Sequence, residues 1–225
     1  MSSGQGGEEQ SKPTKLHSYW RSGCAWRVRT ALTLKNIEYE YVVVNLLKGE
    51  QVSEEYVRVN PNGRVPTLEI DGHVLTQSDA IIQYLEETRP SPALLPEDAF
   101  TRAQVRIICA IIGGDIQPVQ NLAVMKRATR HYPESEQMEQ RLQWGREWVE
   151  RGFDALEIEL KKTAGKYCVG DSVTMADIYL VPQVFSANRF NVDMSKYPTI
   201  ARIEEALAQL PAFQASHPSK QPDAF

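Results

Sequence analysis

Ser22-Gly23-Cys24-Ala25-Trp26-Arg27-Val28-Arg29 is the stretch in which a short strand gives way to a helix. The strand is predicted over Lys15 to Tyr19, and the helix runs from about Ala25 to Lys35. The free backbone N–H groups at the start of such a helix favour a nearby anion, and a thiolate is one. A hydroxyl and a thiol at this junction therefore indicate a place where sulfur is activated.

The residues from Lys15 to about Glu87 alternate between strand and helix patterns. Asp71-Gly72 stands between two short apolar runs, which is typical of a hairpin turn. The last helix of this part has a broad apolar face and begins at Ser78, which we expect to cap it. The remaining predicted elements are a strand over 39–44, a helix over 53–59, strands over 67–70 and 74–75, and that last helix over 78–87. This is the order of a βαβ unit followed by a hairpin and a helix.

A proline-rich segment divides the chain into two parts. Pro90, Pro92 and Pro96 prevent a continuous helix and indicate a linker. Beyond them the strand signal largely disappears, and helical spacing of apolar residues recurs over 101–116, 138–163, 174–187 and 198–210. The sequence therefore predicts a disordered tail over 1–13, an α/β domain over 14–88, a linker over 89–100 and an all-α domain over 101–225.

The segment from Gly170 to Asp177 is interpreted as structural. Thr174 as N-cap and Asp177 three residues later form a variant of the capping box, in which each residue satisfies a backbone N–H of the other. Val173 and Ile178 occupy the positions of a hydrophobic staple.

The composition is that of an ordinary globular protein, since 42% of the 225 residues are hydrophobic and 24% are charged. A net charge of -4 and a pI near 5.7 argue against nucleic acid or anionic lipid as a partner. No apolar run approaches the roughly 18 residues that a membrane helix needs. We therefore expect no nucleic-acid partner and no membrane span.

The cysteines favour a reducing compartment. Cys24, Cys109 and Cys168 are odd in number and widely spaced, so they form neither a metal-type pair nor a disulfide framework. The first dozen residues lack the apolar core of a signal peptide, and Glu8 and Glu9 argue against an organelle transit peptide. The expected location is cytoplasmic.

Metal and nucleotide cofactors are not expected. The four histidines are scattered, and none belongs to a His-Glu-x-x-His helix. Neither a Gly-x-x-x-x-Gly-Lys phosphate loop nor a Gly-x-Gly-x-x-Gly dinucleotide motif is present.

The run from Asn60 to Thr67 predicts a bend before a strand. Pro66 cannot donate to a strand ladder, so we expect it at the start of an edge strand. If the Val65–Pro66 bond is cis, the Val65 backbone turns outward and offers its N–H and C=O to an extended, peptide-like ligand. A simple proline before a strand is the alternative.

Together these motifs resemble the zeta class of glutathione transferases, whose members are also called maleylacetoacetate isomerases. The resemblance runs from about Lys15 to Pro222. Its residues are Ser22-x-Cys24-x-Trp26-Arg27-Val28-Arg29, Val65-Pro66-Thr67, Gln77-Ser78, Gln117-Pro-x-Gln-Asn121-Leu and the box from Asp171 to Asp177.

The resemblance implies a thioredoxin-like domain that binds glutathione beneath a helical substrate-side domain, and a homodimer. It implies glutathione as co-substrate in the cis–trans isomerisation of maleylacetoacetate to fumarylacetoacetate, a step of tyrosine breakdown. It also implies glutathione transferase activity toward small electrophiles such as α-haloacids.

Roles for individual residues follow from the same resemblance. Ser22 is expected to donate its hydroxyl to the glutathione sulfur, with a plain helix cap as the alternative. Cys24 and Arg27 are expected in the catalytic pocket. Glutathione binding is implied for Gln51, Val65, Pro66, Gln77, Ser78, Gln117 and Asn121, with Gln77 and Ser78 on the γ-glutamyl part. Arg27 and Arg189 are candidates for the carboxylates of an acidic substrate.

Two departures and two alternatives remain open. Gly23 stands where many zeta enzymes have a second serine, and Ala123 stands where the best-known members have serine. In the related omega and dehydroascorbate-reductase classes the reactive cysteine stands at the position that Ser22 occupies here. Cys24 lies two residues past that position. A thiol-transferase or dehydroascorbate reductase that uses Cys24 is one alternative. A non-catalytic binding module with the same fold is the other.

Overall fold

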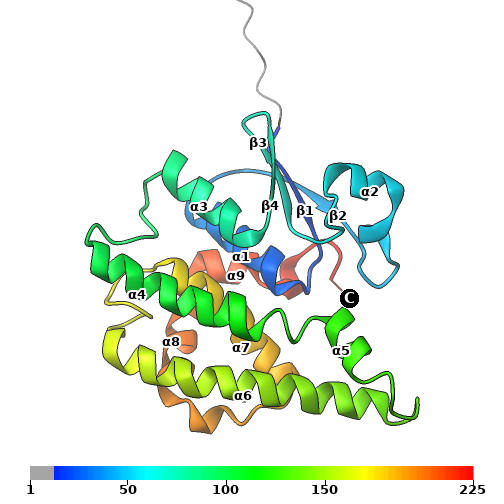
Figure 1. Ribbon diagram of the computed structural model, residues 1–225. Helices are drawn as coiled ribbons and strands as arrows, with labels where there is room; N and C mark the ends of the chain where they lie inside the picture. The colour runs from blue at the N-terminus through cyan, green and yellow to red at the C-terminus, as the bar shows by residue number, and fades with distance from the viewer. Residues whose placement is uncertain (1–12, 225) are drawn as a thin grey trace, which may run out of the picture.

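A computed structural model describes residues 13–224, in which an α/β part precedes a helical part (Figure 1). The predicted fold class, a thioredoxin-like α/β domain followed by an all-α domain, is thereby confirmed. The tail predicted over 1–13 lies outside the described residues except for Pro13.

Four short strands form one mixed sheet with the order β2-β1-β3-β4. They are β1 (Lys15–Ser18), β2 (Glu40–Val43), β3 (Thr67–Ile70) and β4 (His73–Thr76). β1 pairs parallel with β2, and β3 pairs antiparallel with both β1 and β4. The prediction that Pro66 opens an edge strand is therefore wrong, because β3 is an inner strand. Thr67 is already the first paired residue, so the proline occupies no position in the ladder.

The helices of the α/β part are α1 (Gly23–Leu34), η1 (Glu50–Val52), α2 (Glu54–Val59) and α3 (Ser78–Thr88). Helix α1 begins two residues before the predicted Ala25, because Ser22 Oγ accepts the Ala25 N–H at 3.2 Å and caps the first turn. The predicted cap at Ser78 is wrong. Gln77 holds the N-cap position of α3, and Ser78 is the first helical residue.

The helical part contains the four predicted helices and several shorter ones. Asp98 caps the first of these by accepting the Thr101 N–H at 2.7 Å, which moves its start from Thr101 to Ala99. The same predicted helix changes to a π-helix at Ile111. The elements are α4 (Ala99–Ala110), the π-helix η2 (Ile111–Ile116), α5 (Leu122–Ala128), α6 (Gln137–Thr163), α7 (Met175–Arg189), η3 (Met194–Lys196), α8 (Pro198–Ala208), α9 (Pro211–Ser216) and η4 (Pro218–Lys220). Within residues 13–224, no helix is both long and apolar enough to cross a membrane.

Asp177 has the structural role that the sequence predicts. Its fully buried carboxylate accepts the Thr174 N–H at 2.7 Å and the Cys168 N–H at 2.9 Å. Burial raises the pKa of Asp177, and these two donors oppose that shift. The side chain therefore starts α7 and also holds the loop that precedes it.

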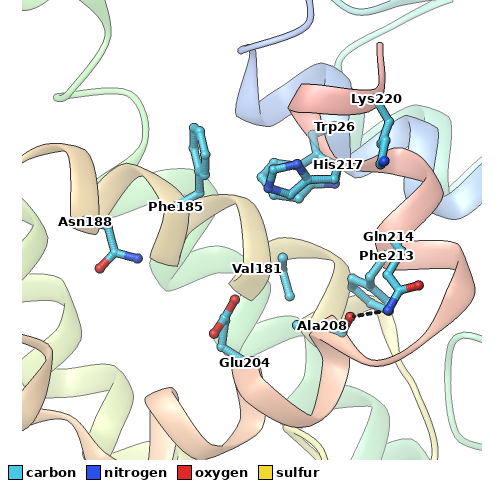
Figure 2. Close-up of a pocket in the computed structure, with 10 residues that line it drawn as sticks. All are labelled: Trp26, Val181, Phe185, Asn188, Glu204, Ala208, Phe213, Gln214, His217 and Lys220. Atoms are coloured by element: carbon cyan, nitrogen blue, oxygen red, sulfur yellow. Dashed lines mark hydrogen bonds between the residues drawn. The ribbon is translucent and has the colours of Figure 1, made fainter.

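The C-terminal segment returns to the α/β part and covers α1. Trp26 donates to Ser216 Oγ at 3.1 Å, and the buried Arg29 donates to the Ser216 carbonyl at 3.2 Å. Asp223 accepts the Trp20 N–H at 3.0 Å. A cavity of about 440 Å³ lies along this seam, where Trp26 and His217 stand close to Phe185 of α7 (Figure 2).

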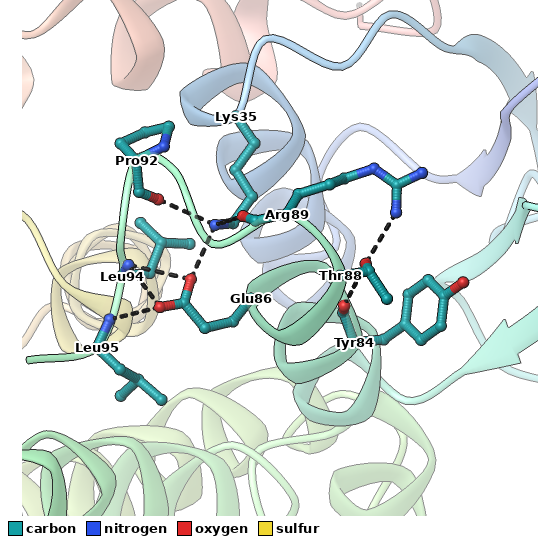
Figure 3. A network of polar contacts seen from close by, with 8 residues as sticks. All are labelled: Lys35, Tyr84, Glu86, Thr88, Arg89, Pro92, Leu94 and Leu95. Carbon is teal, nitrogen blue, oxygen red and sulfur yellow. Dashed lines mark hydrogen bonds and ion pairs between the residues drawn. The ribbon is translucent and has the colours of Figure 1, made fainter. Parts of the chain in front are cut away.

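A buried ion pair fixes the linker between the two parts (Figure 3). Lys35 Nζ lies 2.8 Å from Glu86 Oε2 and donates to the carbonyls of Arg89 and Pro92 at 2.6 and 3.0 Å. Glu86 Oε1 in turn accepts the Leu94 N–H at 2.9 Å. The Lys35 side chain has no exposed surface, so its charge is balanced entirely by these oxygens.

Replacing Lys35 with methionine should destabilise the protein by about 3–5 kcal/mol, because it leaves the Glu86 carboxylate buried without its cation. Urea unfolding followed by circular dichroism measures this loss. The matched control is Lys15→Met, which breaks the half-exposed pair with Glu40 at 3.1 Å and should cost less than about 1 kcal/mol. Equal losses in the two variants would contradict the assigned role of Lys35.

Candidate functional site

One cavity of about 460 Å³ brings together most of the residues that the sequence singles out. We call it the main cavity. Its wall is formed by the start of α1, the loops around η1 and before β3, the start of α3, and the segment from η2 to α5. Nine predicted site residues line it: Ser22, Cys24, Gln51, Val65, Pro66, Gln77, Ser78, Gln117 and Asn121.

Ser22 is the N-cap residue of α1 and lines the main cavity. Its Oγ accepts the Ala25 N–H, so the alternative of a helix cap is realised. A hydroxyl that accepts through its oxygen still has its own proton to donate. The cap and a donor role are therefore compatible, and the capping bond fixes where that proton can point.

The backbone conformation at position 23 does not require a glycine. A Cβ built there would lie 3.6 Å from Pro182 Cβ, an ordinary contact, and its φ angle is not in the left-handed region. A serine would therefore fit at this position. The departure from the zeta pattern removes a hydroxyl without altering the turn.

Gln77 adopts a strained backbone conformation at the edge of the main cavity. Its φ of 67° is rare for a residue with a side chain and costs on the order of 1–3 kcal/mol. Such strain is concentrated at ligand sites. Here it turns the chain so that Ser78, at the first position of α3, lies at the cavity wall beside the positive end of the helix.

The loop before β3 is held from below. The Arg64 carbonyl accepts from Asn60 Nδ2 at 2.7 Å and from Tyr56 OH at 2.8 Å. The Val65–Pro66 bond that follows is cis. Both residues line the main cavity, so the bend faces the site.

Two amide side chains complete the wall of the main cavity. Among the described residues, Gln51 Oε1 is buried without a hydrogen-bond partner, which leaves it an acceptor for a ligand N–H. Gln117 follows the π-helix η2 and lines the cavity from the helical side. A π turn is a common feature of functional sites, and here it widens the helix just before Gln117.

A second cavity of about 440 Å³ adjoins the first and shares Cys24, Gln77, Ser78 and Gln117 with it. We call it the side cavity. Arg27 lines only this one, where its Nη1 lies 3.5 Å from Ser78 Oγ. The structure thus places Arg27 behind Ser78.

The thiols differ in accessibility. Cys24 is half-buried in the first turn of α1 and lines both cavities, whereas Cys109 is buried and lines the side cavity. Burial raises the pKa of Cys109, so its thiol stays protonated. Cys24 is therefore the thiol that a ligand in the main cavity would meet.

Arg189 is not brought to either cavity. It lies at the end of α7, with its guanidinium 4.9 Å from the ring centre of Phe190. Burial lowers the pKa of Arg189, and the charge of Arg21 adds to that effect. Its role in substrate binding stays a prediction.

Sequence reasoning missed several residues of the side cavity. Asp79 directly follows the Gln77-Ser78 motif. A charged residue in the first turn of a helix is usually solvent-exposed, so the sequence alone does not mark it as part of a site. Tyr179 lies in α7, just beyond the segment from Gly170 to Asp177 that we interpret as structural. Neither carries a signal by itself, because they meet only across the two parts of the fold.

Comparison with known proteins gives the class. Residues 12–87 match the family of the glutathione S-transferase N-terminal domain, and residues 119–211 match that of the C-terminal domain. The chain is 52% identical to maleylacetoacetate isomerase from Rattus norvegicus over an alignment that covers 96% of each chain. A probable maleylacetoacetate isomerase of Drosophila melanogaster is 53% identical over 92% of this chain and 89% of its own.

Solved structures agree. A bacterial zeta-class maleyl pyruvate isomerase superposes with a TM-score of 0.88 at 43% identity, covering 94% of this chain and all of that one. Maleylacetoacetate isomerase from Anaeromyxobacter dehalogenans, solved with bound glutathione, gives 0.85 at 44% identity over 95% of this chain and 98% of that one.

A thioredoxin-like domain whose ligand cavity is closed by a helical domain, with these matches over both parts, defines an enzyme of the glutathione transferase type. More narrowly, the chain belongs to the zeta class of the glutathione S-transferase family.

The close approach of Gly63 to η1 yields a test of the main cavity. Gly63 has a φ of +60°, and a Cβ there would lie 3.1 Å from the Gln51 carbonyl oxygen. Gly63→Ala should therefore lose about 1–2 kcal/mol of stability and also weaken glutathione binding about tenfold, because η1 must shift. Thermal melting and isothermal titration calorimetry measure the two effects.

Gly72→Ala is the matched control. Gly72 has a φ of +78°, but its added Cβ would meet nothing within 4 Å. It should show a similar loss of stability with unchanged affinity. If Gly63→Ala keeps full affinity, the approach of Gly63 to Gln51 does not shape the ligand site.

Proposed function

We propose that the protein catalyses the glutathione-dependent cis–trans isomerisation of maleylacetoacetate to fumarylacetoacetate, and that it also transfers glutathione to small electrophiles such as α-haloacids. The observation that carries the proposal is the main cavity. It joins the hydroxyl at the start of α1, the bend at Val65–Pro66 and the start of α3 in one space. The names of the similar enzymes agree with this activity.

The first task of the site is to ionise the glutathione thiol. A thiol with a pKa of about 8.5 is only a few per cent ionised at pH 7, and lowering that pKa by about two units requires roughly 2.7 kcal/mol. A helix N-terminus supplies about 0.3–1 kcal/mol and a hydrogen bond to a charged acceptor about 1.5–3 kcal/mol. We assign the bond to Ser22 and the helix contribution to α1, which together are sufficient.

The thiolate then acts as the nucleophile. It adds to a carbon of the conjugated cis double bond, a C–S bond forms, and the π electrons move to the carbonyl oxygen as an enolate. The former double bond is now single and rotates. The enolate electrons then restore the double bond in its trans form, and the C–S bond breaks to return the thiolate, so no proton, oxidant or reductant is consumed.

The rest of the tripeptide is assigned to the other walls of the main cavity. Gln77 and Ser78 hold the γ-glutamyl part, whose carboxylate is stabilised by the hydroxyl and by the N-terminus of α3. Gln51 and the Val65 backbone bind the extended peptide, with Pro66 fixing the bend. Gln117 and Asn121 contact it from the helical side. Arg189 lines neither cavity, so its assignment to the substrate carboxylates requires a substrate that extends beyond the main cavity.

The proposed setting is the cytoplasm, and the proposed assembly is a homodimer. Three free thiols among the described residues support a reducing compartment. An apolar stripe on the outer face of α4 supports the dimer. Phe100, Ala103 and Ile107 recur at helical spacing there and are all exposed, Phe100 by 72% and Ile107 by 48%.

Ser22→Ala should lower the isomerase activity at pH 7 about 10- to 100-fold in the presence of glutathione. Loss of the donor raises the pKa of the bound thiol by about one to two units, so the fall in kcat/KM at low pH should move upward by the same amount. Kinetics of maleylacetoacetate isomerisation from pH 5.5 to 9, with and without glutathione, measure both effects.

The control for that experiment is Ser53→Ala, which removes an equivalent cap. Ser53 Oγ accepts the Tyr56 N–H at 3.2 Å at the start of α2 but does not line the main cavity. It should lose stability without a shift in the pH profile. Isomerisation by the wild type without glutathione would refute the mechanism. Activity lost in Cys24→Ala but kept in Ser22→Ala would favour the thiol-transferase alternative.

Ile107→Asp should dissociate the proposed dimer, because a carboxylate in the α4 stripe cannot be buried without a partner. Sedimentation velocity of the wild type and the variant measures the mass. Ile158→Asp is the matched control, since Ile158 is a similarly exposed isoleucine (57%) on α6. A wild-type monomer, or an equal effect of both variants, would contradict a dimer through α4.

A further inference from the structure

A hydrogen bond links α7 of the helical part to the start of α3 in the α/β part. The Tyr179 hydroxyl donates to Asp79 Oδ1 at 2.9 Å. The second carboxylate oxygen, Asp79 Oδ2, accepts from Gln83 Nε2 at 2.6 Å. The Asp79 carboxylate is therefore held on both sides, directly after Ser78 in the chain.

The guanidinium of Arg27 also stacks on the ring of Tyr179. The Arg27 Cζ atom lies 4.1 Å from the ring centre, and Arg27 Nη1 lies 3.5 Å from Ser78 Oγ. Arg27 is only 3% exposed, and its Nε has no hydrogen-bond partner among the described residues. No described carboxylate forms an ion pair with Arg27, so its buried charge depends on the ring beneath it.

The π-helix η2 keeps this stack in place. A Cβ added to Gly113 would lie 3.1 Å from Tyr179 Cε1 and 3.7 Å from Arg27 Nη1. A side chain at this position would press on the ring, so the glycine lets η2 pass close to the ring and the guanidinium. Burial raises the pKa of Tyr179, so the hydroxyl keeps its proton and remains a donor to Asp79 at physiological pH.

We propose that Tyr179 is a positioning residue for glutathione binding, which acts through Arg27 and Asp79 on Ser78. The target is the α-carboxylate of the γ-glutamyl part. This inference rests on the proposed function, because that function assigns this carboxylate to Ser78.

The charges explain why such a device is needed. Arg27 approaches Ser78 Oγ as a donor, which leaves the hydroxyl proton free for an incoming carboxylate. Asp79 carries the opposite charge one residue further on and would repel that carboxylate. The bonds from Tyr179 and Gln83 fix the two Asp79 oxygens and draw off part of their charge. Removing the Tyr179 hydroxyl releases one oxygen of Asp79 and weakens binding without touching the sulfur.

Tyr179→Phe is the direct test, because it removes only the hydroxyl and keeps the ring beneath Arg27. The KM for glutathione should rise about three- to tenfold, with kcat at saturating glutathione unchanged. A second ligand sharpens the test. With γ-aminobutyryl-cysteinylglycine, which lacks only the α-carboxylate, wild type and Tyr179→Phe should show the same KM.

Tyr197→Phe is the control for a purely structural effect. The Tyr197 hydroxyl donates to Asp154 at 3.0 Å, and Tyr197 and Tyr179 are each only 2% exposed, but Tyr197 lines neither the main nor the side cavity. It should melt at a lower temperature with an unchanged KM for glutathione. A rise in KM of equal size for both ligands in Tyr179→Phe would overturn the inference, and so would an unchanged KM for glutathione.

Ser78→Ala separates failure of the inference from failure of the proposed function. If Ser78→Ala discriminates between the two ligands and Tyr179→Phe does not, the γ-glutamyl site stands and the role of Tyr179 is wrong. If neither variant discriminates, the carboxylate does not bind at Ser78, and both assignments fall.

Discussion

The burial of two arginines in one helix is the constraint on which the rest of the structure depends. Every residue of α1 from 25 to 32 is buried, including Arg27 and Arg29. A buried guanidinium must find acceptors or an aromatic face, and a 12-residue helix cannot supply them itself. Its surroundings must therefore come from elsewhere in the chain, which is why α3, α7 and the C-terminal segment all converge on α1.

The buried charges of the two arginines are stabilised in different ways. Arg29 is surrounded by acceptors: it donates to the Trp20 carbonyl at 2.9 Å, to Ser18 Oγ at 3.1 Å and to the Ser216 carbonyl. Desolvation nevertheless lowers the pKa of Arg29 to about 10. Its role is to join the C-terminal segment to the sheet. Arg27 has an aromatic face, a distant hydroxyl and an unused N–H, and it lines a cavity. The first arrangement is closed and structural, whereas the second is open to a ligand.

The sequence predicted those parts of the fold that local chemistry decides. Asp71-Gly72 takes positive φ values and forms the hairpin, and the box of Thr174 and Asp177 starts α7 as expected. Local chemistry also misled at Ser78. Serine is a good cap, but the chain turns one residue earlier at Gln77, in a strained conformation that no propensity favours. The short helices α5 and α9 were missed because their stability comes from packing rather than from a periodic apolar face.

In the candidate site, too, the residues with a local sequence signal could be predicted and those brought together by packing could not. Motifs with their own turn chemistry, such as the one around Val65–Pro66, could be recognised singly, and the main cavity contains them together. The pair formed by Asp79 and Tyr179 could not, because the two residues are 100 positions apart and meet only once α7 packs on α1. A contact between domains has no local signature in a single sequence.

Two helix N-termini face the main cavity, and they differ in what supports them. The start of α1 is capped by Ser22 itself, and Gly23 provides no second hydroxyl, so in the proposed binding mode the sulfur end of glutathione depends on one side chain. The start of α3 has no side-chain cap, and its support comes from Arg27 and Tyr179 behind it. Arg27 lies in α1, five residues after Ser22, so in the proposed binding mode one helix supplies both the donor for the sulfur and the cation behind the γ-glutamyl carboxylate. In that binding mode, any movement of α1 relative to α7 would disturb both ends of the tripeptide together.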